Sequence, residues 1–272
     1  MHFRLLAVHA HPDDESIGTG GTLALYARRG VHVVLVCATR GEEGKLHGVN
    51  PSEDPATIRT RELEAACRIL GIEDVRFLGY RDSGMAGTPA NSHPEAFCNA
   101  DPLEASRQLA GILRETRPHV VITYNERGFY GHPDHVAANK VTNLALEEAR
   151  NPGPRGEPPW EVPRLFYTAA PRSRLLRLDQ FLRTQGNTGL PYSVEILGTQ
   201  DDEITAWIDV REVLHLKLKA ISCHRSQLGP HSLFSRLPSS LYEEAWGTEC
   251  YVLARGTYGI QEKISDLFWG LP

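Results

Sequence analysis

The sequence predicts an α/β protein with a Rossmann-like, doubly wound and mostly parallel sheet that carries helices on both faces. Short apolar runs typical of buried strands alternate with amphipathic helical segments throughout residues 1–150. This alternation indicates parallel strands joined by right-handed helical crossovers. The chain has 272 residues, 41% of them hydrophobic, which is enough for one large domain with a sizeable core.

The first half of the chain shows the most regular alternation. We expect strands at residues 3–10, 31–37, 75–78 and 119–124. We expect helices within residues 16–30, 56–70, 103–115 and 134–150. Gly71 is placed to end the second of these helices. Residues 86–100 contain Gly, Pro, Asn and Ser, and we expect them to form a loop over the functional edge of the sheet.

Three glycines, Gly18, Gly20 and Gly21, stand at the start of the first predicted helix. They do not form the GxGxxG fingerprint of a dinucleotide site, and no phosphate-binding lysine follows them. We therefore expect them to let the helix pack closely on the sheet or to let the backbone approach the site.

The second half of the chain is less regular, and residues 151–163, rich in Pro and Gly, form the one credible linker. After it we expect strands at residues 164–169, 205–210 and 251–254 and helices at residues 174–183 and 213–226. We predict a single α/β domain over residues 1–272, with its core in residues 1–150. Residues 164–272 are expected to complete the sheet and the rim of the site.

Composition and charge argue against several classes of protein. The net charge of −5 offers no broad basic field for nucleic acid. No apolar run reaches the roughly 20 residues of a membrane span, and the N-terminus shows no secretory signal. The five cysteines are scattered without a CxxC pair, which is typical of reduced thiols in a cytoplasmic protein. We expect a small-molecule partner, and a homo-oligomer is compatible with the sequence.

Two related motifs follow predicted strands. One is Ala-His-Pro-Asp-Asp-Glu at residues 10–15, and the other is Tyr-Gly-His-Pro-Asp-His at residues 130–135. A single His-Pro-Asp is typical of an ordinary turn, because proline fixes φ and aspartate binds nearby amides. Two copies at the carboxyl ends of parallel strands instead predict a mixed histidine–carboxylate metal site, at the edge where such folds bind ligands.

The first motif offers more ligands than one metal ion can use. Sterics let only two of His11, Asp13 and Asp14 face one ion, and the economical ligand set is His11, Asp14 and His135. Asp13 then remains beside the ion as a general base for bound water. Zinc (Zn²⁺) suits this set and lowers the pKa of water towards about 7. Ferrous iron (Fe²⁺) is an alternative, because availability often decides between similar metals.

The second motif supplies groups for the remaining steps of a hydrolysis. We expect His132 to stand across the site as an electrophile or general acid, which in its cationic form stabilises an oxyanion and protonates a leaving amine. Asp134 is expected to hold His132 or a ligand histidine in the right tautomer. Tyr130 is expected to donate a hydrogen bond to the oxyanion. The predicted reaction class is metal-assisted hydrolysis of an acyl or similar bond.

The paired motifs resemble those of the PIG-L/LmbE-like family of metal-dependent N-deacetylases, which act mainly on N-acetylglucosaminyl (GlcNAc) groups. The resemblance covers most of the first 150 residues. It includes Thr-Arg-Gly-Glu at residues 39–42, residues 59–63 and Arg-Asp-Ser-Gly-Met at residues 81–85, and it resumes weakly at residues 224–227. It implies the same metal ligands, general base and oxyanion histidine as the residues themselves suggest.

The resemblance also implies a sugar-binding side of the site. It implies that Arg59 and Asp82 grip sugar hydroxyls and that Met85 belongs with them. From the residues alone, a solvated helix charge is the alternative interpretation of Arg59, and a turn former is the alternative interpretation of Asp82. The segment at residues 81–85 resembles the thiol-cofactor branch of the family, the mycothiol and bacillithiol deacetylases. His224 is expected near the site because it matches the family's pattern at a helix end.

These observations predict a cytoplasmic, zinc-dependent hydrolase that removes the N-acetyl group from a GlcNAc-containing small molecule, of the GlcNAc-malate or GlcNAc-inositol type. One alternative is an amidase of mycothiol-like S-conjugates, which uses the same groups on a larger acyl group. A second alternative is a sugar-binding module without turnover. The presence of Asp13 argues against that module, since a binder needs no base.

Overall fold

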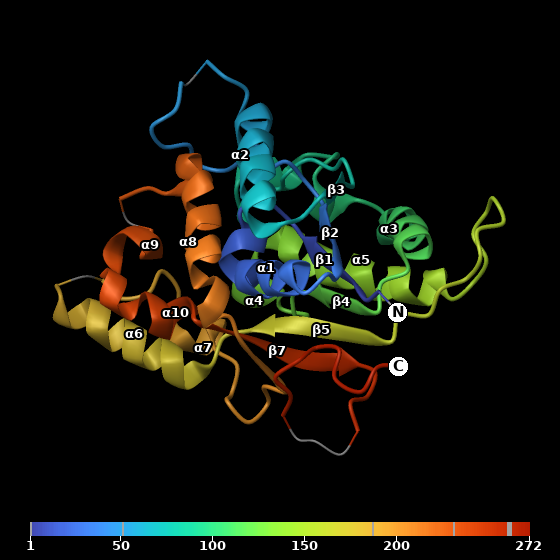
Figure 1. Cartoon of the computed structure of the whole chain (residues 1–272). Coiled ribbons are helices and arrows are strands. Elements are labelled where there is room, and N and C mark those ends of the chain that lie inside the picture. The colour runs from blue at the N-terminus through green and yellow to red at the C-terminus, as the bar shows by residue number, and fades with distance from the viewer. Residues whose placement is uncertain (1, 51, 187, 231, 260–262) are drawn as a thin grey trace.

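One seven-stranded sheet organises the part of the chain that the structure describes. The computed structural model describes residues 2–50, 52–186, 188–230, 232–259 and 263–272. The strand order is β3-β2-β1-β4-β5-β7-β6 (Figure 1). The strands are β1 (Arg4–His9), β2 (His32–Cys37), β3 (Asp74–Phe77), β4 (Val120–Thr123), β5 (Arg164–Ala169), β6 (Ala206–Asp209) and β7 (Thr248–Arg255). The first five pair in parallel and β7 is antiparallel to β5 and β6, so the predicted mostly parallel α/β sheet is confirmed.

The strand order reverses between β1 and β4. β2 and β3 lie on one side of β1, and β4 and β5 lie on the other. β1 pairs with β4 in parallel, from Leu5 opposite Val120 to Ala7 opposite Ile122. In open α/β sheets, ligand sites form at the carboxyl ends of the strands where the order reverses. The loops after β1 and β4 carry the two motifs, so this pairing brings the motifs together.

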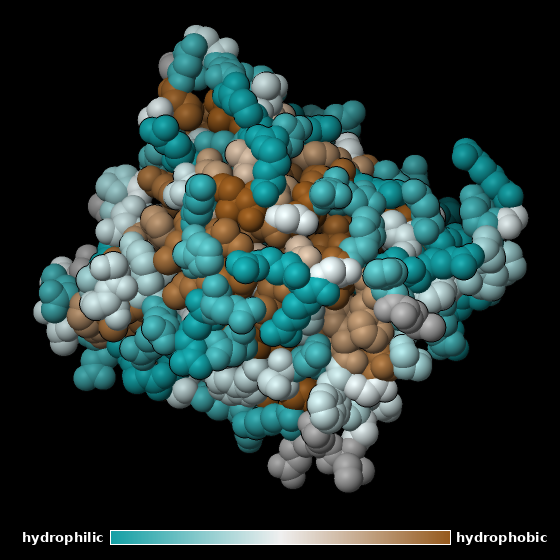
Figure 2. All heavy atoms as spheres, in the orientation of Figure 1, coloured by the Kyte–Doolittle hydropathy of each residue, from teal (hydrophilic) through white to brown (hydrophobic). Residues whose placement is uncertain are grey.

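Helices cover both faces of the sheet, as predicted. α1, α2 and α8 pack against one face, and α3 and α5 pack against the other (Figure 1). The helices are α1 (Gly20–Arg28), α2 (Pro55–Leu70), α3 (Pro102–Thr116), α4 (Gly128–Gly131), α5 (Pro133–Ala149), α6 (Arg172–Thr184), α7 (Val194–Leu197), α8 (Leu214–Cys223), α9 (Leu233–Arg236) and α10 (Tyr242–Trp246). Figure 2 shows mostly hydrophilic side chains on the face of α1, α2 and α8, with hydrophobic atoms visible between them.

A third apolar cluster lies beyond the carboxyl ends of the strands. It is built mainly from α6, α7 and α10. In Figure 1 these helices stand on the side toward which the arrowhead of β5 points. The second half of the chain thus adds three strands to the sheet and a helical layer beside the edge that carries the motifs. A single domain over the whole chain stays our prediction. In the described part of the chain, no helix has both the length and the apolar character needed to cross a membrane.

The second half departs from the prediction in detail. The helix expected at residues 213–226 ends at Cys223, because His224 adopts a ψ of 51° and a separate 3-10 turn follows at Arg225–Gln227. β7 is longer than the strand expected at residues 251–254. The helices α4, α7, α9 and α10 were not predicted, since each has only four or five residues and shows no helical period.

Gly21 is the glycine of the first helix that close packing requires. A Cβ atom there would lie 2.6 Å from Cγ2 of Val210 and 3.0 Å from Oε1 of Glu249. A Cβ atom at Gly18 would meet nothing within 4 Å. The expected close approach is therefore confirmed for Gly21, which packs against the polypeptide that follows β6.

We expect Gly21→Ala to lower the free energy of unfolding by about 1–3 kcal/mol, because an added methyl overpacks the contact with Val210. Gly18→Ala is the matched control. It should leave stability unchanged or raise it by up to about 1 kcal/mol, since the site is open and alanine favours helix. Denaturant unfolding measures both. Equal losses in the two variants would contradict the packing argument.

Candidate metal centre and active site

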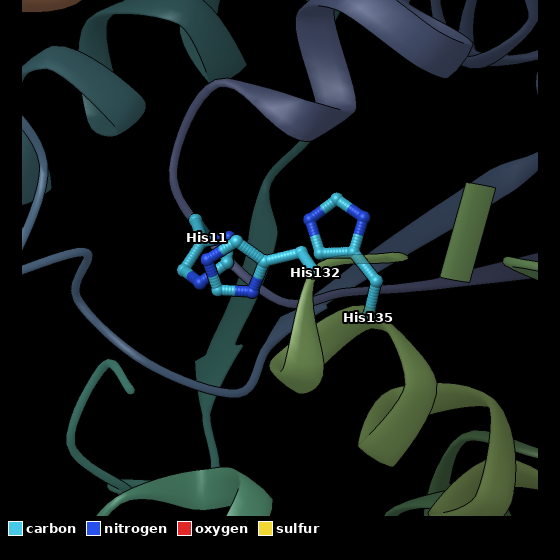
Figure 3. A group of neighbouring side chains, drawn as sticks. All are labelled: His11, His132 and His135. Atoms are coloured by element: carbon cyan, nitrogen blue, oxygen red, sulfur yellow. The ribbon is translucent and has the colours of Figure 1, made fainter. Parts of the chain in front are cut away.

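The two motifs meet at the carboxyl ends of β1 and β4. His11 lies in the loop after β1, while His132 and His135 lie at the start of α5 (Figure 3). All three side chains are buried, and each offers a ring nitrogen within 4.8 Å of the others. Pro133 occupies the first turn of α5, as predicted, and this helix start turns both of its histidines toward His11. The cluster can therefore hold a metal ion.

Asp14 lies between two of these histidines. Its Oδ2 atom is 3.4 Å from Nδ1 of His11 and 3.3 Å from Nε2 of His135. The same oxygen accepts the backbone N–H of His11 at 2.9 Å and the hydroxyl of Tyr124 at 2.8 Å. Burial opposes ionisation, but the two histidines hold the pKa of Asp14 well below its usual range. The predicted ligands thus form one close group around a carboxylate.

His135 indicates that this group fits a cation. Both of its ring nitrogens are buried, and neither has a hydrogen-bond partner among the described residues. A buried polar atom without a partner is costly, so such an atom points to a ligand. Two histidines and a carboxylate are a donor set that suits zinc or ferrous iron.

The far side of His11 faces two carboxylates. Its Nε2 atom lies 3.2 Å from Oδ2 of Asp134 and 3.4 Å from Oδ1 of Asp82. Asp134 is itself fixed by the backbone N–H groups of Ser83, at 2.9 Å, and Cys98, at 3.0 Å. Burial lowers the pKa of His11, but hydrogen bonds to the carboxylates outweigh it and raise this pKa well above its usual value. The Asp134 side chain therefore orients the ring of His11, so that its other nitrogen, Nδ1, faces Asp14.

Asp13 has an unusual backbone conformation. Its φ is +112°, a region that residues with a side chain rarely occupy. Its N–H donates to Oε2 of Glu15 at 2.9 Å, and its carboxylate accepts from Nη2 of Arg59 at 3.1 Å. Burial raises the pKa of Asp13 to about 6, although Arg59 acts in the opposite direction. A carboxylate with this pKa is suited to act as a base near neutral pH.

The surroundings of His132 favour its neutral form, whereas the sequence suggested a cationic form. Its Nδ1 atom accepts the backbone N–H of Asp134 at 3.2 Å and so caps α5. Burial and the nearby rings of His11 and His135 lower its pKa to about 4. The ring proton therefore resides on Nε2, where it is available for donation.

Arg59 connects two loops beneath the centre. Its Nη1 donates to the carbonyl of Gly41 at 2.8 Å, and its Nη2 donates to the carbonyl of Pro12 and to Asp13. Only 3% of Arg59 is exposed, so its interpretation as a solvated helix charge is wrong. Gly41 has a φ of +70°, and a Cβ atom there would collide with the guanidinium at 2.1 Å. A contact of Arg59 with sugar hydroxyls stays a prediction.

Asp82 lies on the side of the centre that Nε2 of His11 faces, and Met85 follows it by three residues in the chain. Oδ1 of Asp82 accepts the N–H of Gly84 at 2.8 Å, so Asp82 does form a turn, besides lying near His11. Met85 is 37% exposed, and its sulfur lies 4.0 Å from the hydroxyl of Tyr192. Their predicted contacts with a sugar stay predictions.

A cavity of about 390 Å³ adjoins the centre. Asp13, Asp14 and His135 line one end of it. Apolar side chains of α6, α7 and α10 line much of the rest, among them Leu175, Leu178, Leu197, Ala245 and Trp246, together with polar residues such as Arg174 and Glu249. Tyr130 also lines this cavity, with its ring centroid 5.0 Å from that of His135. Burial raises the pKa of Tyr130, so its hydroxyl keeps its proton and can donate it in a hydrogen bond.

Sequence reasoning missed Tyr124, which touches two of the predicted ligands. Its hydroxyl donates to Asp14 at 2.8 Å and accepts the N–H of Ala10 at 2.9 Å. Its ring stacks on His135, with centroids 4.0 Å apart and planes inclined by 15°. The one available signal was its position directly after a buried strand, at the edge that carries the second motif.

Fold and site together define an α/β protein with a buried histidine–carboxylate centre where its strand order reverses. The family described as PIG-L, GlcNAc-PI de-N-acetylase, matches residues 6–146. The 1D-myo-inositol 2-acetamido-2-deoxy-alpha-D-glucopyranoside deacetylase of Thermomonospora curvata is 43% identical over 99% of this chain and 97% of its own. That of Acidothermus cellulolyticus is 44% identical over 98% and 94%. The chain therefore belongs to the PIG-L family, which confirms the predicted resemblance.

A solved structure agrees on the fold. The N,N'-diacetylchitobiose deacetylase from Pyrococcus horikoshii superposes with a TM-score of 0.64 at 23% identity. The match covers 92% of this chain and 83% of that chain. At this identity the comparison supports the α/β fold alone.

We expect Tyr124→Phe to weaken zinc binding about 10-fold, because it deletes the hydrogen bond to Asp14 and keeps the stack on His135. Competition with a chelator measures the dissociation constant. Tyr167→Phe is the control, since its hydroxyl contacts Asn143 rather than a predicted ligand. Equal affinities in the two variants would show that Asp14 needs no such support.

Proposed function

We propose that this protein is a metal-dependent N-deacetylase of a GlcNAc-inositol compound, 1D-myo-inositol 2-acetamido-2-deoxy-α-D-glucopyranoside. The observation that carries the proposal is the position of Asp13, with its raised pKa, beside the cluster of His11, Asp14 and His135. Relatives more than 40% identical over nearly the whole chain carry the name of that deacetylase, which favours the inositol compound over GlcNAc-malate. A cytoplasmic location and a small-molecule partner belong to the same proposal.

The ligand set in this proposal is His11, Asp14 and His135, holding Zn²⁺ or Fe²⁺. His11 contributes Nδ1, since its Nε2 is engaged by Asp134. His135 contributes a buried ring nitrogen that makes no hydrogen bond among the described residues. A bound ion supplies Lewis acidity for the amide carbonyl and lowers the pKa of water.

The residues around the ligands supply the proton transfers. Asp13 takes a proton from the attacking water, and the resulting acid returns it to the leaving amine, because a pKa of about 6 suits both steps. His132 acts as a neutral electrophile that donates its Nε2–H to the developing oxyanion. Tyr130 is a second donor to that oxyanion, and Asp134 keeps His11 oriented.

The sugar occupies the side of the centre that carries Asp82 and Met85. Asp82 offers a buried carboxylate for a hydroxyl group, and Met85 offers an exposed apolar contact. Arg59 completes this side, and its Nε is buried without a hydrogen-bond partner in the described part of the chain.

One observation favours the second candidate function, the amidase of S-conjugates. The apolar cavity beside Asp13 and His135 has a volume of about 390 Å³, which is more than an acetyl group needs. An acyl group larger than acetyl fits such a space, so cleavage of a larger amide is the alternative to test.

We expect acetate release from GlcNAc-inositol by protein that has been stripped of metal and reloaded with Zn²⁺ or Fe²⁺. Release from GlcNAc-malate should be slower.

Asp13→Asn should lower kcat by about 10³-fold while leaving the metal bound, because it removes the base alone. Asp54→Asn, at the exposed start of α2, is the control. Cleavage of an S-conjugate without acetate release would instead establish the amidase, and full turnover by Asp13→Asn would contradict the role of this residue.

We expect kcat/KM to fall as the pH drops through about 6. The pKa of Asp13 is raised, so below that pH its carboxylate carries a proton and cannot accept another. Above that pH the profile should be level until another group titrates. Metal content must be measured at each pH, because ligand histidines also take up protons. A flat profile between pH 5 and 7 at constant metal content would exclude Asp13 as the base.

A further inference from the structure

Glu15 and His224 form a buried pair beside the loop after β1, residues 10–14, which carries His11, Asp13 and Asp14. His224 Nε2 donates to Oε1 of Glu15 at 2.7 Å, across 209 residues of sequence. Both residues are almost fully buried, at 0% and 1% exposed. The Nδ1 atom of His224 has no hydrogen-bond partner among the described residues. The polar contacts of the ring are therefore those of Nε2, with Glu15 and the neighbouring Ser16. The proposed function gives neither Glu15 nor His224 a role.

The second oxygen of Glu15 holds the backbone of Asp13. Oε2 of Glu15 accepts the N–H of Asp13 at 2.9 Å, and the carbonyl of Asp13 accepts the N–H groups of Ser16 and Ile17 at 3.1 and 3.0 Å. The peptide groups on both sides of Asp13 are therefore fixed at its positive φ of +112°. Such strained conformations persist only where surrounding contacts determine them.

The conformation of Asp13 decides where the neighbouring side chains point. The side chains of His11 and Asp14 face each other at 3.4 Å, whereas the carboxylate of Asp13 is turned toward Arg59, at 3.1 Å. A residue in an extended or helical conformation at this position would send these side chains in other directions. The positive φ is thus what separates the base from the ligands.

We propose that Glu15 and His224 are positioning residues, which hold Asp13 in the backbone conformation that its action as a base requires. Glu15 contacts Asp13 directly, and His224 acts through Glu15. This inference rests on the proposed function, because it takes Asp13 as the base. A role in stability alone is the competing explanation, and buried ion pairs are weak evidence for stability.

The test compares the full-length variants Glu15→Ala, Glu15→Gln and His224→Phe, loaded with zinc. We expect kcat per bound metal to fall about 100-fold in Glu15→Ala and about 10-fold in His224→Phe, with KM changed less than about threefold. Glu15→Gln should restore kcat to within about fivefold. Its amide oxygen can accept the N–H of Asp13, while its NH₂ donates to the other tautomer of His224.

Two further measurements separate positioning from stability. The double variant of Glu15→Ala with His224→Phe should be no slower than Glu15→Ala alone, since His224 acts through Glu15. His119→Phe is the matched control. That histidine is also buried and accepts the backbone N–H of Arg4 at 3.2 Å, at the opposite end of β4. It should lower stability and leave kcat per bound metal unchanged.

A crystal structure of Glu15→Ala gives a readout that does not depend on turnover. We expect φ of Asp13 to leave the positive region, and His224→Phe supplies the same test if Glu15→Ala does not fold. An unchanged φ, an unchanged kcat per bound metal, or additive losses in the double variant would overturn the inference. Absence of any hydrolysis by the wild-type protein, together with a changed φ in the variant, would refute the proposed function and leave the positioning of Asp13 in place.

Discussion

The parallel pairing of β1 with β4 is the constraint on which the site depends. Neighbouring strands lie about 4.8 Å apart, so the loops that follow them are close before any side chain is considered. Both strands are buried on both faces by helices, and their register is therefore set by core packing. The histidines and carboxylates of the two motifs lie directly after β1 and at the start of α5, rather than in long loops. Such supports position these side chains before any ion binds.

Charge balance follows from this crowding. The two loops and their neighbours bring five acidic side chains together: Asp13, Asp14, Glu15, Asp82 and Asp134. A buried charge is costly unless it is paired, and the partners come from elsewhere in the chain. Arg59 pairs with Asp13, and His224 pairs with Glu15. His11 lies within 3.4 Å of the other three carboxylates, those of Asp14, Asp82 and Asp134. A divalent cation is the natural complement to the negative charge that remains.

The sequence was sufficient to predict the parallel core and the meeting of the motifs, because both depend on local patterns. His11 directly follows an apolar strand, and Pro133 marks the helix that carries His135. The contacts that refine the site are not local. Tyr124 reaches Asp14 across 110 residues, and no periodicity encodes such a pairing. The lowered pKa of His132 likewise depends on neighbours in space, and the four short helices lack the length to show a period.

The position of β7 between β5 and β6 has a consequence for how the protein assembles. β6 precedes β7 in the chain, yet among the strands that the structure describes it is paired with β7 and joins the sheet at its edge. Glu249 on β7 also accepts the N–H of Gly21, 228 residues earlier, and pairs with Lys217 of α8. On the ribosome, the parallel strands of the first half can pair as they emerge. The start of α1, which follows the loop that carries His11 and Asp14, gains its contact with Glu249 only when β7 has been made. Maturation of the centre is thereby coupled to completion of the sheet.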